Sequence, residues 1–168
     1  ETGAGKKTII YGWSQGGGVA VAAASMPDYF AKQGTAADNL ELVGSVALAP
    51  DDIAIMLPGA TVDQASAQKS LSGLIKMFTS NVFDFSHMAM SMWGVQAANP
   101  NLKLTDIFTE QGAKVLDEVI SNKCMHAVAD TLNFNFSSQY KTLLKDQITN
   151  PLEWTKTMVK GSVNPIKP

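Results

Sequence analysis

A single serine near the start of the chain lies in a spacing that is typical of a catalytic nucleophile. The pentapeptide Gly12-Trp13-Ser14-Gln15-Gly16 has the form G-x-S-x-G, in which a sharp turn between a strand and a helix exposes a serine hydroxyl. Because Gly12 and Gly16 carry no Cβ, we expect them to let the strand and the helix approach closely. The hydroxyl of Ser14 would attack a carbonyl carbon, and the backbone N–H of Gln15 would stabilise the oxyanion that forms.

The segments around this turn predict the elements that would position it. Residues 7–11 (Lys-Thr-Ile-Ile-Tyr) are β-branched and aromatic, which favours a buried strand, and the alanine-rich residues 19–24 favour a helix. Residues 40–49 form a second apolar strand that ends at Pro50. Strand, helix and strand within about forty residues predict a βαβ unit whose strands are parallel and buried on both faces. Two such strands do not form a stable sheet alone, so we expect neighbouring strands from outside this sequence.

The rest of the chain has the apolar spacing of helices. One helix face is predicted by Leu71, Leu74, Ile75, Phe78 and Val82, a second by Val115, Leu116, Val119 and Ile120, and a third by Tyr140, Leu143, Leu144 and Ile148. We expect Thr109 to cap the second helix, which would end near Asn122. A short fourth helix is predicted at residues 152–159.

Several large apolar residues are candidates for contact with a substrate. The run from His87 to Trp93 contains three methionines, whose adaptable side chains suit a pocket for varied apolar substrates. On this interpretation Met88, Met92 and Trp93 would contact an acyl chain, together with Phe78. The alternative is ordinary packing between helices. Trp13 has two similar interpretations, as part of the pocket wall or as strand packing.

Composition excludes several other functions. The chain has 168 residues, a net charge of −2 and 13 basic residues, all of them lysine, so the bidentate arginine contacts used on phosphate and guanine are absent and nucleic-acid binding is not expected. No apolar run reaches the roughly 18 residues of a transmembrane helix. One cysteine and two histidines do not predict a metal site, and no cofactor is expected. Residues 3–8 hint at a phosphate loop, but they precede a strand where a phosphate loop follows one.

The elbow sequence Gly-Trp-Ser-Gln-Gly-Gly resembles the α/β-hydrolase superfamily, and its Ser-Gln-Gly-Gly ending is similar to the secretory lipase (lipase A-like) family. The strand at residues 42–50, the long helical insertion after it and the Asn164-Pro165 pair leading back to the core agree with this resemblance. The resemblance implies an α/β fold class: a partial hydrolase core at 1–50, an inserted all-helical cap at 51–160 and a return segment at 161–168. It also implies that the N- and C-terminal core segments of the same protein lie outside this chain, which would then be an internal fragment.

The same resemblance implies a serine carboxylic-ester hydrolase, a lipase or esterase that acts on acyl esters or lipids and is secreted or extracytoplasmic. The catalytic Asp and His are then expected after Pro168, so the 168 residues alone would be inactive. A triad within the chain would have to combine Asp51 or Asp52 with His87 or His126, and cap helices rarely bring a base within about 3 Å of the nucleophile. We expect the two aspartates to cap the start of the inserted region instead.

Three alternatives stay open in the sequence. The lone Cys124 either pairs with a cysteine of the upstream core, as the resemblance suggests, or is a buried free thiol. A noncatalytic α/β-hydrolase relative that binds a hydrophobic ligand is the second alternative. A serine peptidase of the prolyl-oligopeptidase type is the third, since such enzymes have a similar elbow. The helical insertion after the second strand argues against it, because those enzymes carry their extra domain ahead of the core.

Overall fold

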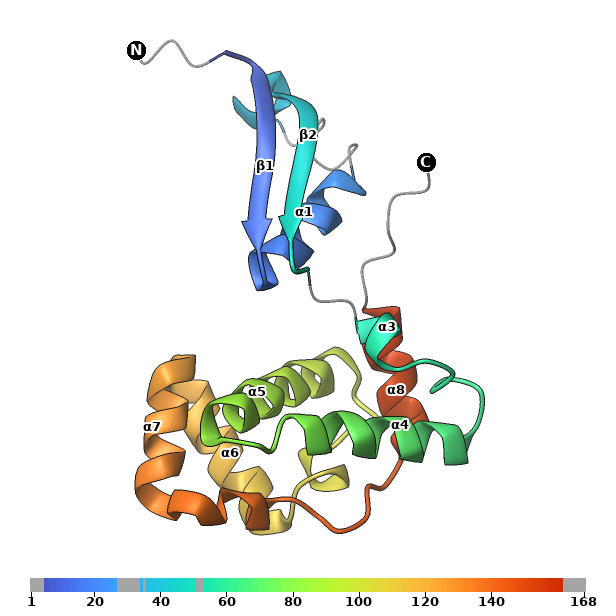
Figure 1. The fold of residues 1–168 in the computed structure, drawn as a ribbon, viewed down its shortest axis with the longest axis vertical. Coiled ribbons are helices and arrows are strands. Elements are labelled where there is room, and N and C mark those ends of the chain that lie inside the picture. The colour runs from blue at the N-terminus through green and yellow to red at the C-terminus, as the bar shows by residue number, and fades with distance from the viewer. Residues whose placement is uncertain (1–4, 27–33, 35, 51–52, 162–168) are drawn as a thin grey trace. The chain divides into compact units, whose positions relative to one another are not determined.

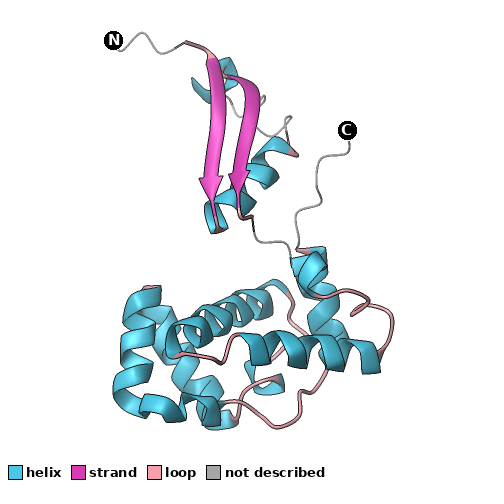
Figure 2. Ribbon diagram, viewed as in Figure 1, coloured by secondary structure: helices cyan, strands magenta, loops and turns pink. Residues whose placement is uncertain are grey.

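The computed structural model describes residues 5–26, 34, 36–50 and 53–161. The chain has a mixed α/β structure that is mostly helical, with a small parallel sheet (Figure 2). It divides into two compact units, with the boundary between Ile53 and Ala54. We call the first the elbow unit and the second, Ala54–Gly161, the helical unit. The elements of the two units are labelled in Figure 1.

The elbow unit is a strand–helix–strand arrangement. Strand β1 (Lys7–Trp13) is followed by helix α1 (Gln15–Ala24), a short 3-10 helix η1 (Ala36–Asn39) and strand β2 (Glu41–Leu48). The two strands pair in parallel, as predicted. The helix begins at Gln15, four residues earlier than expected, because the three glycines after Gln15 are themselves helical.

One face of this sheet is covered and the other is open. Helix α1 packs on the first face, where the Ser45 hydroxyl donates a hydrogen bond to the Ala20 carbonyl at 3.1 Å. On the opposite face, Tyr11 lies beside Val46 and Trp13 beside Leu48, and the exposed fractions of these four side chains are 42% or more. The prediction that the strands are buried on both faces is therefore wrong for the described part of the chain, because only α1 packs on them.

The helical unit contains six helices of four or more residues in its described part, together with two 3-10 segments. They are α3 (Ile53–Met56), α4 (Gln64–Met77), α5 (Val82–Ala98), η2 (Leu104–Asp106), α6 (Glu110–Asn122), α7 (Met125–Phe136), η3 (Ser137–Leu143) and α8 (Pro151–Lys160). Helix α5 packs against α6, α7 and α8, and α4 packs against α8. The core between them holds Phe85, Phe108, Leu132 and Trp154, all fully buried.

Three buried or capping polar groups in this unit have well-defined hydrogen-bond partners. Asp63 caps α4 by accepting the Ser66 N–H at 2.8 Å, and this hydrogen bond lowers the pKa of the Asp63 carboxyl. The buried Tyr140 donates its hydroxyl proton to the Thr79 carbonyl at 3.3 Å, and burial raises the pKa of its phenol. Thr155, which is fully buried, donates to the Ala60 carbonyl at 2.8 Å.

Two of the predicted helices are confirmed. Helix α6 ends at Asn122 as expected, and Thr109 caps it by accepting the Gly112 N–H at 3.0 Å. Helix α8 covers the predicted residues 152–159 with one further residue at each end.

The other helix predictions need correction. The face assigned to Leu71–Val82 stops at Phe78, because Asn81 caps a separate helix, α5, that begins at Val82. Residues 140–148 do not form an α-helix. They end η3 and then run as irregular chain, because Leu144 pairs with Phe108 and the Lys145 N–H donates to the Ile107 carbonyl at 2.9 Å. Helix α7 was not predicted.

Gly112 is the most crowded of the described glycines in the helical unit. A Cβ at this position would overlap the carbonyl oxygen of Leu143, which also accepts the Thr109 N–H at 2.9 Å and so is held in place. We expect Gly112→Ala to lower the free energy of unfolding by about 2–3 kcal/mol. The matched control is Gly94→Ala in α5, where a Cβ would meet nothing within 4 Å. Urea denaturation of both variants checks this, and an equal midpoint for the two would contradict it.

Candidate active site

Ser14 occupies the turn between β1 and α1 in a strained backbone conformation. Its φ and ψ angles are 54° and −121°, a combination that residues with a side chain rarely adopt and that costs about 1–3 kcal/mol. The Ser14 N–H donates to the Leu48 carbonyl at 2.9 Å, and its own carbonyl accepts the Gly18 N–H at 3.1 Å. These two bonds join the turn to the end of β2 and to the first turn of α1, so the strained geometry is held from both sides.

The hydroxyl of Ser14 is not used to stabilise the helix that it precedes. The residue stands at the N-cap position of α1, yet its side chain makes no capping hydrogen bond. The N–H of Gln15, the first helical residue, has no hydrogen-bond partner within the described residues. Ser14, which is half-buried, therefore precedes an N–H without a partner among the described residues at the positive end of a helix, where a developing oxyanion is favoured.

The close approach around the turn depends on glycines, but not on the pair that was predicted. A Cβ at Gly12 would overlap the carbonyl oxygen of Gly16, as expected for the strand side. A Cβ at Gly16 would meet nothing within 4 Å, so the collision predicted there is absent. The crowded helical position is Gly17, where a Cβ would lie 2.6 Å from the Leu48 carbonyl oxygen, because the first turn of α1 passes over the end of β2. The run of three glycines was the available signal for this position.

The elbow unit contains no histidine, since the two histidines of the sequence are in the helical unit. His87 is half-buried in α5. His126 is exposed in the first turn of α7, with its ring centroid 5.3 Å from that of Phe83. Asp51 and Asp52, the acids considered for a triad and for capping, lie outside the described residues.

Of the predicted substrate-binding residues in the helical unit, two are buried in its core. Met88 and Met92 are 4% and 1% exposed and pack in the helical core, because the helical period puts them on the buried face of α5. Trp93 is half-buried and donates its indole N–H to Asp117 at 2.8 Å, and Phe78 is half-buried where α4 ends. Trp13 is 71% exposed on β1. For the methionines, the structure therefore agrees with the packing interpretation.

Cys124 is an exposed thiol at the N-cap position of α7. The alternative of a buried free thiol is therefore wrong. Pairing with a cysteine outside this sequence stays a prediction, and the exposed position is compatible with it.

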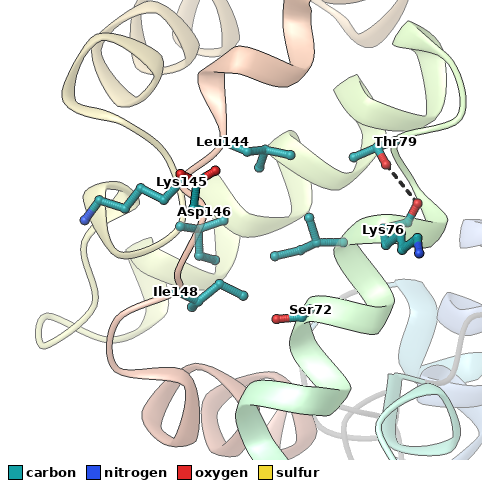
Figure 3. A pocket seen from close by; sticks show the side chains of 9 residues that line it. Ser72, Lys76, Thr79, Leu144, Lys145, Asp146 and Ile148 are labelled. Carbon is teal, nitrogen blue, oxygen red and sulfur yellow. Dashed lines mark hydrogen bonds between the residues drawn. The ribbon is translucent and has the colours of Figure 1, made fainter.

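Other residues line the concave parts of the helical unit. A pocket of about 250 Å³ lies between α4 and the chain around residue 146 (Figure 3). Its apolar side consists of Ile75, Ile107, Leu144 and Ile148, with Ser72 at the edge. None of these was a predicted site residue, since the pocket depends on the irregular segment that the helix prediction missed.

No three His, Cys, Asp or Glu side chains of the described residues gather in a way that could hold a metal ion. Among the helices that the structure describes, none is both long and apolar enough to cross a membrane. Comparison of the chain with protein-family models, with curated proteins and with solved structures gave no significant match.

Proposed function

We propose that this chain carries the nucleophile of a serine carboxylic-ester hydrolase of the α/β-hydrolase type, a lipase or esterase. The observation that supports it is Ser14, held in a strained turn between a parallel strand and a helix, with a hydroxyl that caps nothing. Strain of this kind persists where the surrounding structure enforces it, and it is concentrated at functional sites.

The chemistry would be acyl transfer. The Ser14 oxygen attacks the ester carbonyl carbon while a histidine accepts its proton, and the Gln15 N–H donates to the oxyanion of the tetrahedral intermediate. The alcohol leaves with a proton from the histidine, and water then releases the acid and restores Ser14. The proposal requires a histidine from outside the elbow unit, whose sequence contains none, and an acid that orients this histidine. It also assigns acyl binding to the helical unit and an extracytoplasmic location to the protein.

The test is covalent labelling of the full natural protein with a fluorophosphonate, a probe that reacts with activated serines. We expect one adduct on the peptide that contains Ser14, detected by mass spectrometry, and its loss in Ser14→Ala. Ser137 offers a matched control because its φ and ψ, 49° and −127°, are close to those of Ser14. It follows a helix rather than a strand, so Ser137→Ala should leave labelling unchanged.

The outcomes separate the candidate functions. If the fluorophosphonate does not label Ser14, a noncatalytic relative is favoured. In such a protein the strained backbone at Ser14 would serve no reaction. Labelling at Ser14 together with cleavage of a peptide, but of no acyl ester, would favour the peptidase alternative.

A further inference from the structure

An open groove of about 560 Å³ runs along one side of helix α4, opposite the side that holds the pocket of Figure 3. Helix α4 contributes Lys69, Ser70, Gly73, Leu74 and Met77, and the chain before α4 contributes Met56. The volume lies within the roughly 300–1,000 Å³ of small-molecule sites in proteins. None of the residues discussed above as catalytic lines this groove.

The floor of the groove is open because α4 has a glycine, Gly73, in its C-terminal half. A Cβ at Gly73 would meet nothing within 4 Å, so packing inside the chain does not require the glycine. Glycine inside a helix is less stable than alanine, since it loses more backbone entropy on folding. The glycine leaves space next to the helix backbone, in a groove that Met56 and Met77 also line.

The walls of the groove suit a flexible apolar chain, and one edge suits an anion. Leu74 is 5% exposed and forms the base, whereas Met77 is 63% exposed and can rearrange around a ligand. Lys69 is the one charged residue that lines the groove, and within the described residues its ammonium has no ionic partner. The half-buried Ser70 hydroxyl likewise has no hydrogen-bond partner among the residues that the structure describes.

We propose that this groove binds an anionic single-chain amphiphile, an acyl carboxylate. The carboxylate lies at Lys69 and Ser70, and the acyl chain runs over Gly73 toward Met77, a span of about 12 Å along the helix. Charge complementarity with one lysine favours a single negative head group. The choice of a carboxylate rests on the proposed function, because ester hydrolysis would release one.

The test measures binding of decanoate, below its micelle concentration, to the full protein carrying Ser14→Ala, so that the probe cannot acylate the nucleophile. Titration calorimetry should show saturable binding. Gly73→Leu should weaken it about tenfold or more, because leucine fills the groove floor, while the melting temperature stays the same or rises. Gly94→Leu, at a helix glycine that is also surrounded by open space, should bind decanoate normally. Lys69→Gln should weaken binding and reduce its salt dependence, and decyltrimethylammonium should bind less well than decanoate.

Absence of saturable binding, or equal weakening by Gly73→Leu and Gly94→Leu, would overturn the inference. Equal affinity for the cationic and anionic probes would overturn the role of Lys69. These failures are distinguishable from failure of the proposed function, which depends on Ser14 labelling in protein with the natural serine. Decanoate binding without Ser14 labelling would support the groove and remove ester hydrolysis as the source of its ligand.

Discussion

An enzyme that carries Ser14→Ala should hydrolyse acyl esters about 10⁴-fold or more slowly than the unmodified enzyme, because the acyl-enzyme can no longer form. The loss should appear in kcat, since Ser14 acts in the bond-forming step. Its stability should stay nearly unchanged, because alanine keeps the Cβ and with it the strain of the positive φ of 54°, while the serine side chain makes no capping hydrogen bond that could be lost.

The measurement is steady-state hydrolysis of a chromogenic ester by the full protein, with folding of each variant checked by circular dichroism. Ser137→Ala is the control for a strained serine outside the elbow and should keep full activity. Full activity in Ser14→Ala would end the assignment of Ser14 as nucleophile, whatever the labelling experiment shows.

Gly12→Ala should be the most disruptive small substitution in the elbow unit. Its Cβ would overlap the Gly16 carbonyl oxygen, a backbone atom that cannot rotate away, so β1 and α1 would have to separate. We expect a loss of about 3 kcal/mol or more in the free energy of unfolding and loss of fluorophosphonate labelling at Ser14.

Gly16→Ala is the matched control, two residues after the nucleophile. Since a Cβ there meets nothing within 4 Å and the residue is helical, the substitution should stabilise the protein by about 0.5–1 kcal/mol. Chemical denaturation and labelling of the two variants side by side check this. The structural account of the turn would fail if Gly16→Ala were as disruptive as Gly12→Ala.

Much of the elbow unit could be predicted because its signals are local. Residues 7–11 and 40–49 are apolar and rich in β-branched side chains, and a short helical connection between two such strands makes them parallel. The position of Ser14 between strand and helix followed from the G-x-S-x-G spacing. The same spacing did not show which helical glycine is crowded, because that depends on how α1 passes over Leu48, thirty-one residues later in the chain than Gly17.

In the helical unit, the prediction of α6 was correct because a capping residue and the spacing of apolar residues indicated the same helix. Thr109 and the apolar residues of α6 mark both the beginning and the face of that helix. The spacing of Tyr140, Leu143, Leu144 and Ile148 also fits a helix, but the backbone there bonds to residues 106–109 instead. Periodicity reports the preference of an isolated segment, and hydrogen bonds to a distant segment override it.

By itself the sequence determined the candidate nucleophile, the parallel strand–helix–strand around it and the helices α6 and α8, because propensities, caps and apolar periods act between residues close in the chain. Only the tertiary structure decided that Met88 and Met92 are core, that Cys124 is exposed and that Gly73 opens onto a groove. Burial depends on which elements pack against a given face. That choice is made by side chains far apart in the sequence, so a local pattern does not contain it.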